Sequence, residues 1–349
     1  MRNEKLDIFR GLAMIWVILV HCLYWLGYFS WHKSFLLIEM PLFFFIAGAS
    51  NGMASKKSLG VFYLTRFKRI LMPYWIYGII CVALISIVST PETIKSFIKL
   101  AYSWVNPFAS TLSSITYLTW AIWFIPVYLL VILAFPLFEK IRNIQYMRYF
   151  PLFLLLLLIG ILNFFENGGT VLYYAKMFVC YGFFTYLGLF FTEITKERKI
   201  FPAFAIVAIC LLTMFVLVKF FGQSLNMQNN KFPPNFMFFS FSLAALTIFY
   251  IFSDIIVNAI KFLSRNKIFD WIYIQYGFTI FLFHPFVFLL LGYLKKNYFA
   301  GVNSKISFII IFLLAILLSA VIGKMFSWVE RKNIFSINEK KKNKARETS

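Results

Sequence analysis

Long apolar runs alternate with short polar segments along almost the whole chain. A helix needs about 20 apolar residues to cross the hydrocarbon core of a bilayer. Because these runs are too long for barrel strands, they predict helices. The ten predicted spans are residues 8–28, 35–54, 73–90, 117–138, 149–165, 171–192, 200–221, 235–254, 272–292 and 306–328. The pattern therefore predicts an all-α polytopic membrane bundle of about ten transmembrane helices.

The polar segments define the domain organisation. A turn signal at residues 166–169 divides one long apolar stretch into two spans. No polar segment is long enough to form a soluble domain. We therefore expect a single transmembrane domain over residues 1–332, followed by a basic cytoplasmic tail at 333–349.

The composition supports a membrane protein. Hydrophobic residues make up 61% of the 349 residues and charged residues only 13%, against about 25% charged residues in soluble domains. The net charge of +21 is spread over short loops and tails rather than one face, which excludes a nucleic-acid partner. The four cysteines lie inside apolar runs without metal or redox spacing, so no metal site is expected.

The distribution of positive charge predicts the orientation. With ten spans, 25 of the 34 lysines and arginines, including every arginine, fall on the side that holds both termini. Lysine and arginine are enriched on the cytoplasmic side of membrane proteins, so both termini are expected there. No small-x-small cleavage site follows the first apolar run, which predicts a retained first span.

Three ionisable residues inside the apolar runs are candidates for chemistry, because such groups are costly in lipid. They are His21, Glu39 and His284. At 1.5 Å per helical residue, His21 lies roughly 16 Å above Arg10, and the predicted topology puts all three in the outer half. A neutral histidine can take a proton from a hydroxyl, and a carboxylate can orient an imidazole. Alternatively, each histidine bonds a neighbouring helix carbonyl or hydroxyl.

A second candidate site lies on the predicted cytoplasmic side. Arg66 and Arg69 are three residues apart, which puts both guanidinium groups on one face of a helix. Arginine pairs bind phosphate through bidentate bonds, and Arg10 is close enough in topology to contribute. The alternative is ordinary positive-inside charge. Taken together, the two sites suit a reaction across the membrane, while ion or lipid transport fits them as well.

Several motifs resemble those of the acyltransferase-3 family, which includes O-antigen and exopolysaccharide O-acetylases. Residues 6–13 with His21 resemble its LDxLRGxA…H signature, and ten residues separate Arg10 from His21. Residues 40–48 resemble a PLFFFISG stretch, with Ala47 in place of serine. Three further matches are Arg66–Trp75 with RxxR and RLxPYW, 123–126 with WFLP, and 277–285 with YSLPIYLLHPP, where Phe281 replaces a tyrosine.

The resemblance covers nearly the whole chain in family order and implies ten spans. It implies transfer of an acyl group, usually acetyl from acetyl-CoA, to a hydroxyl of an extracytoplasmic glycan or lipid-linked sugar. Arg10, Arg66 and Arg69 would bind the donor phosphates, and His21 would act as the base or carry a transient acyl group. His284 would bind the acceptor or stabilise charge. Glu39 is assigned to imidazole orientation from its depth alone.

The resemblance also implies a multi-pass protein of the bacterial plasma membrane. Some members carry an appended soluble esterase-like domain, whereas a stand-alone acyltransferase is expected here. A flippase for lipid-linked sugars is the main alternative, although paired half-helix sites and internal symmetry are not visible. A structural or assembly subunit of a polysaccharide synthase is the third possibility.

Overall fold

The computed structural model describes residues 3–54, 58–89, 91–109, 112–165, 168–197, 199–264 and 276–331. Within these ranges the chain is helical, and apart from an isolated bridge between Lys231 and Pro234 it has no β-structure. The all-α prediction is confirmed. The predicted tail at 333–349 lies outside the described residues, as does residue 332, so the predicted domain boundary stays a prediction.

The helices follow one another with short connections. Their order is α1 (Glu4–Trp25), η1 (Trp31–Leu36), α2 (Glu39–Gly52), α3 (Leu59–Val88), α4 (Ile94–Val105), α5 (Tyr117–Trp120), α6 (Phe124–Arg142), α7 (Phe150–Asn163), α8 (Gly169–Gly188), α9 (Phe191–Glu197), α10 (Ile200–Phe221), η2 (Met227–Asn230), α11 (Phe236–Ile251), α12 (Ser253–Ser264), α14 (Gly277–Tyr298), α15 (Ser304–Met325) and α16 (Ser327–Arg331).

Seven helical segments of the described chain are long and apolar enough to cross a membrane. Two bent pairs, α8 with α9 at 53° and α11 with α12 at 58°, raise this to nine if each pair is one span. The remaining predicted span, 149–165, contains only the 14-residue α7. A helix of that length reaches about 21 Å, which is short of the roughly 30 Å hydrocarbon core. The polytopic bundle is confirmed, with nine full spans at most in the described chain.

The third span begins earlier than its apolar run suggests. Helix α3 starts at Leu59 and continues for 30 residues through Pro73, whereas the hydrophobic pattern predicts a start at residue 73. The charged residues that end the apolar run do not end the helix, because arginine and lysine are good helix formers. Arg66 and Arg69 therefore stand on a helix that is continuous with a membrane span.

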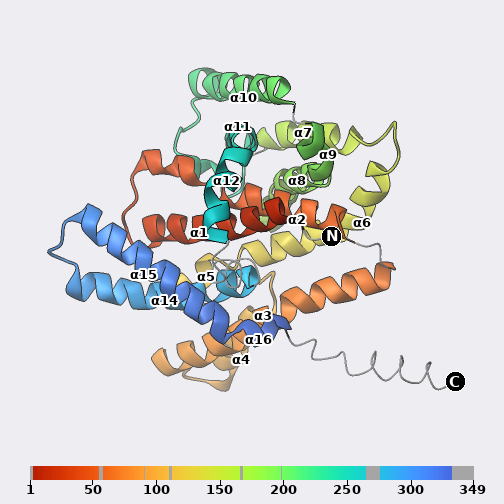
Figure 1. The fold of residues 1–349 in the computed structure, drawn as a ribbon. Coiled ribbons are helices and arrows are strands. Elements are labelled where there is room, and N and C mark those ends of the chain that lie inside the picture. The colour runs from red at the N-terminus through yellow and green to blue at the C-terminus, as the bar shows by residue number, and fades with distance from the viewer. Residues whose placement is uncertain are drawn as a thin grey trace.

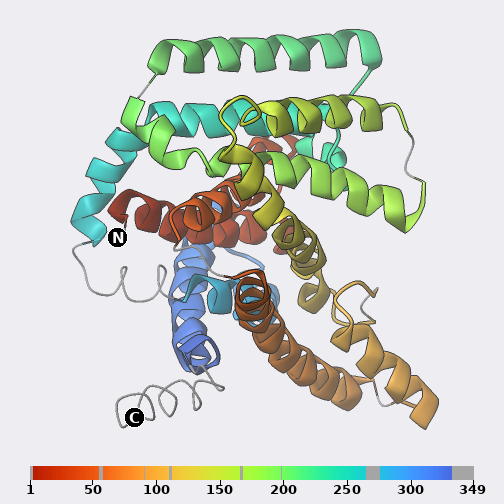
Figure 2. The same cartoon turned by 90° about the vertical axis from the view of Figure 1, so that its right-hand side faces the viewer.

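Helices α1 and α2 lie at the centre of the bundle (Figures 1 and 2). In the 18-residue apolar stretch of α1, 67% of the residues are buried, against 22% in that of α10. Helix α10 covers one edge of the bundle and packs mainly on α11. Helix α2 packs closely on α8, and α1 also contacts α14 and α15. The buried centre therefore brings together the helices that carry His21, Glu39 and His284.

The contact between α2 and α8 depends on two glycines. A Cβ atom at Gly48 would lie 1.9 Å from the carbonyl oxygen of Thr185, and one at Gly188 would lie 2.0 Å from that of Phe45. Small residues allow backbones of membrane helices to approach this closely. Gly48 belongs to the 40–48 motif, so this motif sets the spacing of the two helices.

Candidate functional site

Two histidines from helices far apart in the sequence meet in the centre of the bundle. Nδ1 of His21 on α1 lies 2.6 Å from Nε2 of His284 on α14. His284 is fully buried, while His21 is partly exposed. His284 Nδ1 lies 2.6 Å from the carbonyl oxygen of Phe281. The prediction that His21 and His284 share one depth thus corresponds to a direct contact.

This chain of two hydrogen bonds assigns the tautomers of the neutral pair. A carbonyl oxygen only accepts, so Nδ1 of His284 carries a proton and donates it to Phe281. Nε2 of His284 is then an acceptor, and Nδ1 of His21 donates to it. The remaining nitrogen, His21 Nε2, keeps its lone pair. His21 therefore presents a base whose orientation is set by His284.

Aromatic rings hold this pair in place. Trp25 stacks on His21 with centroids 3.9 Å apart and an interplanar angle of 12°. Its centroid lies 5.3 Å from that of His284, and Phe288 meets His21 edge-on at 6.1 Å. A base at the catalytic centre gains from such packing, because its ring cannot rotate away from the reacting atoms.

Glu39 contacts a lysine instead of an imidazole. Its Oε1 forms a buried ion pair and hydrogen bond with Nζ of Lys231, a residue between η2 and α11. The side chains of both are nearly inaccessible to solvent, at 2% and 6% exposure. Lys231 Nζ also lies 5.7 Å from the ring centroid of Trp123 and acts electrostatically on His21. Glu39 is thus near the histidine pair, but His284 is the residue that orients His21.

The predicted phosphate-binding arginines line one cavity at the other end of the bundle. Arg66 and Arg69 border a cavity of about 630 Å³ between α3, the end of α2 and the end of α6. Lys140 adds a third positive charge, and Glu139 is the one carboxylate in the wall. Proteins bind phosphate with the bidentate guanidinium group of arginine and with the ammonium group of lysine. The wall therefore has the charge of an anion site.

The two arginines are not neutralised by carboxylates in the described chain. Arg66 donates to the neutral Asn51 at 3.2 Å and lies over the Phe62 ring. Arg69 is exposed and has no hydrogen-bond or ion-pair partner among the described residues. The buried amide nitrogen of Asn51 also lacks a partner in this part of the chain. Several donors thus converge on the cavity without acceptors to match them.

Arg10 occupies a different position. It is not part of the cavity wall, and its guanidinium donates to Asp7 at 2.7 Å and to Ser50 at 2.6 Å. It lies close enough to Arg69 for the two charges to interact. Arg10 therefore stands beside the arginine cavity with its own counter-ion.

Aromatic residues lie between Arg10, beside the arginine cavity, and the histidine pair. Tyr128 lies within electrostatic range of Arg10, and its ring stacks on Phe124 at 5.1 Å. Phe124 meets Phe281 at 4.9 Å, and Phe281 lies 5.9 Å from His284. His21 is not part of the cavity wall that contains Arg66 and Arg69. A column of aromatic contacts therefore runs from beside Arg10 to His284, and roughly 16 Å of α1 separates Arg10 from His21.

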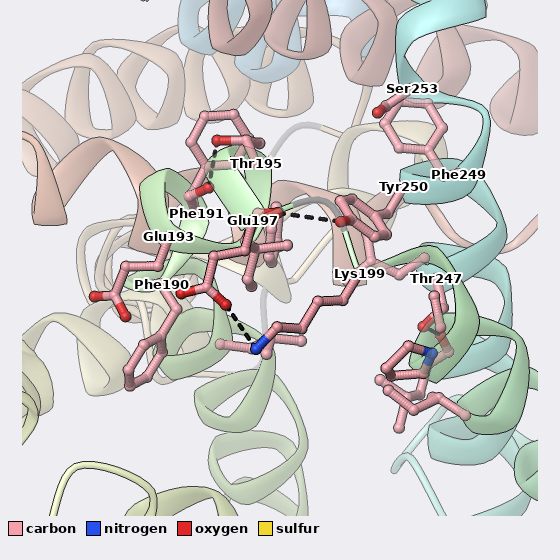
Figure 3. Close-up of a pocket in the computed structure, with 18 of the residues that line it drawn as sticks. Phe190, Phe191, Glu193, Thr195, Glu197, Lys199, Thr247, Phe249, Tyr250 and Ser253 are labelled. Atoms are coloured by element: carbon pink, nitrogen blue, oxygen red, sulfur yellow. Dashed lines mark hydrogen bonds and ion pairs between the residues drawn. The ribbon is translucent and has the colours of Figure 1, made fainter.

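Another cavity, of about 440 Å³, lies between the α8–α9 bend, α10 and α11 (Figure 3). Its walls are mostly apolar, and its polar groups largely satisfy one another: Lys199 pairs with Glu197 at 2.8 Å, and the Tyr250 hydroxyl donates to the Ile194 carbonyl at 3.1 Å. None of the six predicted site residues lines it. It is therefore separate from the histidine and arginine sites.

Comparison with protein families gives a decisive match. The model of the acyltransferase domain family known as acyltransferase 3 matches residues 3–324, which is nearly the whole chain. The chain belongs to the acyltransferase-3 family. It is thus a multi-pass membrane acyltransferase. Comparison with curated proteins gives no match, and comparison with solved structures gives none.

The acyltransferase-3 motifs converge in the described structure. Residues 6–21 lie on α1, 40–48 on α2, 66–75 on α3, 123–126 at the start of α6, and 277–285 on α14. Helix α1 contacts α2 and α14, and α3 contacts α6 and α14. Five motifs that are far apart in the sequence therefore surround one centre.

Sequence reasoning missed two residues of this acyltransferase-3 centre, Lys231 and Trp25. Lys231 counts in the sequence as one more outer-side positive charge, and no local pattern distinguishes it from the other lysines of that side. Trp25 follows His21 by four residues on a predicted helix. That i, i+4 spacing places both rings on one face and is a signal that could have identified it.

Proposed function

We propose that this membrane acyltransferase moves an acyl group, acetyl in the simplest case, from cytoplasmic acetyl-CoA to a hydroxyl of an extracytoplasmic envelope glycan or lipid-linked sugar. It would do so in the bacterial plasma membrane. The main support is His21, whose Nε2 lone pair remains free while Nδ1 is bound to His284. An oriented base with a free lone pair is what removal of a proton from an acceptor hydroxyl requires.

The arginine cavity is the proposed donor site. Arg66 and Arg69 would bind the phosphates of CoA, with Arg10 contributing its charge beside them. Arg66 and Arg69 belong to the predicted side of the membrane that holds 25 of the 34 lysines and arginines. Because this enrichment is typical of the cytoplasmic side, it supports a cytoplasmic location for the cavity. The pantetheine arm would then extend along the aromatic column toward His21, over the roughly 16 Å of α1 that separate Arg10 from His21.

The proposed reaction is a general-base acyl transfer. His21 Nε2 removes the proton of the acceptor hydroxyl as its oxygen attacks the thioester carbonyl carbon. The carbon–sulfur bond then breaks, and the imidazolium returns the proton to the CoA sulfur. His284 acts as a positioning residue, because its Nε2 accepts from His21 Nδ1 and keeps the tautomer that leaves Nε2 basic. An acyl-His21 intermediate uses the same lone pair as a nucleophile.

The test uses membrane vesicles that contain the protein, acetyl-CoA labelled in the acetyl group, and envelope polysaccharide freed of its own esters. Label should pass to the polysaccharide with the wild type and stay in acetyl-CoA with His21→Ala at equal expression. Acetyl-CoA binding should be unchanged in His21→Ala, because the donor cavity is separate. If label never moves but a fluorescent lipid-linked sugar crosses the vesicle bilayer, the transporter alternative is correct.

A further inference from the structure

A cavity of about 550 Å³ opens at the end of the bundle that carries Lys176 and Lys231. Its walls come from the segment after α4, the start of α6 and the start of α8. Four aromatic side chains contribute to them: Phe108, Trp123, Tyr173 and Tyr174. Such amphipathic rings offer a flat apolar face together with a polar edge. The cavity therefore suits a ligand with both apolar faces and hydroxyl groups.

Trp123 connects this cavity to the buried Glu39–Lys231 pair. Its ring forms part of the cavity wall, and the Lys231 ammonium lies 5.7 Å from its centroid. Tyr181 stands behind it, with ring centroids 5.8 Å apart. Lys231 in turn acts electrostatically on His21. The tryptophan is thus shared between an open aromatic cavity and a buried polar cluster beside the catalytic base.

The buried polar cluster contains groups that lack partners. Tyr181 is fully buried and its hydroxyl has no hydrogen bond in the described chain. The same holds for Oε2 of Glu39, whose side chain is 2% exposed, and for the buried hydroxyl of Tyr24. Both tyrosines lie within electrostatic range of Glu39. Buried polar atoms are normally hydrogen-bonded, so one carboxylate oxygen and two nearby hydroxyls without partners indicate a missing polar ligand.

We infer that this aromatic cavity is the acceptor site, that it holds one saccharide ring against Trp123, Tyr173 and Tyr174, and that the hydroxyls of the ring reach the buried Glu39–Lys231 pair and Tyr181 when the intervening Trp123 ring shifts. The inference rests on the proposed function and adds the location and chemistry of its second substrate. A sugar ring has C–H faces that pack on aromatic rings and hydroxyl edges that donate and accept. Glu39 and Lys231 are then acceptor-binding residues, and Lys231 links them to His21, on which it acts electrostatically.

The location of the cavity agrees with an extracytoplasmic acceptor. The charge asymmetry predicts that Lys176 and Lys231 lie on the outer side, opposite to Arg66 and Arg69. The acceptor would therefore enter from one end of the bundle and the donor from the other. His21 lies between the two entrances.

The experiment blocks the cavity without requiring a known acceptor. Thr170 is an exposed wall residue, and all four native cysteines are buried. Intact cells carrying Thr170→Cys are treated with a bulky, membrane-impermeant maleimide and then fed labelled acetate. The readout is labelled acetyl ester in the extracted envelope glycan. The matched control is Gly301→Cys, in the exposed loop after α14, where an added Cβ meets nothing within 4 Å.

Modification by the maleimide should lower acetyl transfer by Thr170→Cys at least tenfold. The same modification of Gly301→Cys should leave most of its acetyl transfer intact. Acetyl-CoA binding to membranes from both should be equal. The inference is overturned if modified Thr170→Cys transfers normally, or if the maleimide cannot reach Thr170→Cys. If the unmodified wild type puts no acetyl on any glycan, the proposed function itself fails and the acceptor site fails with it.

A second variant separates ligand binding from a structural role. Tyr181→Phe removes a hydroxyl that has no partner, so it should leave the thermal unfolding midpoint unchanged and lower transfer between about two- and tenfold. Tyr77→Phe is the control, because its buried hydroxyl donates to the Leu118 carbonyl at 2.8 Å. Tyr77→Phe should lower the midpoint and keep transfer per folded molecule. Unchanged transfer in Tyr181→Phe would remove this hydroxyl from the acceptor site.

Discussion

His21 Nδ1 lies 2.6 Å from His284 Nε2, and His284 Nδ1 lies at the same distance from the Phe281 carbonyl oxygen. This relay starts at a backbone oxygen and ends at a free imidazole nitrogen. In many hydrolases a carboxylate orients the catalytic histidine and stabilises its cation. Here a neutral imidazole supplies the orientation, which requires no buried negative charge next to the base.

The first prediction concerns His284 as the positioning residue. His284→Ala removes the acceptor of the His21 Nδ1 proton, and we expect transfer to fall by about 10²- to 10⁴-fold, because loss of the group that orients a catalytic histidine can cost about 10⁴-fold. His284→Gln should retain more activity, since its side-chain oxygen can occupy the position of Nε2. The measurement is the rate constant of single-turnover transfer. Equal rates in the two variants would contradict a role in hydrogen bonding.

The second prediction concerns the donor cavity. Arg66→Ala and Arg69→Ala should each weaken acetyl-CoA binding by about 10- to 100-fold, because each removes charge-assisted hydrogen bonds to phosphate. Arg66→Lys keeps the charge but loses the fork geometry and should lose nearly as much. Binding is measured by titration of the purified protein in nanodiscs.

The control for the donor cavity is Lys199→Ala, which removes an exposed positive charge outside the cavity. It should leave acetyl-CoA affinity unchanged. If Arg69→Ala binds acetyl-CoA as tightly as the wild type, the donor site lies elsewhere. Full affinity in Arg66→Lys would mean that positive charge alone, without bidentate contacts, attracts the donor.

Hydrophobic patterning was sufficient to predict the helical bundle, because lipid requires every span to satisfy its own backbone. It could not predict where α3 begins, since Arg66, Lys68 and Arg69 end the apolar run but extend the helix. It also predicted a full membrane span at residues 149–165, where the structure has the 14-residue α7. Apolar length reports on the membrane environment, whereas helix ends depend on residues that the hydropathy pattern treats as polar loops.

The candidate site was predictable in part. Spacing places His21 and His284 at a common depth, but depth does not determine which side chains touch. The partner of Glu39 is 192 positions away in a loop, and a contact of that kind depends on the tertiary fold. Glu39 illustrates the consequence: its depth suggested an imidazole partner, and the folded chain pairs it with Lys231.

The third prediction tests the packing of α2 on α8. Gly48→Ala would bring a methyl group to 1.9 Å from the Thr185 carbonyl oxygen, so the helices must separate. We expect a lower thermal unfolding midpoint and less folded protein in the membrane. Gly160→Ala in α7 is the control, because a Cβ there meets nothing within 4 Å. It should be neutral or stabilising by up to about 1 kcal/mol. Equal stability of the two variants would show that α2 and α8 have room to shift.

The last prediction separates the structural cost of the Glu39–Lys231 pair from its part in catalysis. Lys231→Met leaves a carboxylate that is almost fully buried without its counter-charge. Breaking a buried pair in this way costs about 3–5 kcal/mol, so the unfolding midpoint should fall clearly. The exposed Lys199–Glu197 pair is the control, and Lys199→Met should change the midpoint little because solvent screens both charges.

The double variant Glu39→Leu with Lys231→Met decides between the two roles. It removes both charges, and replacing a buried pair by apolar residues of similar volume is often neutral or stabilising. The midpoint should therefore recover toward the wild-type value. Transfer should not recover, because the acceptor hydroxyls have lost both of their charged partners while His21 and His284 remain in place. Recovery of transfer together with the midpoint would show that the pair only maintains the fold, and that the acceptor is bound by other groups.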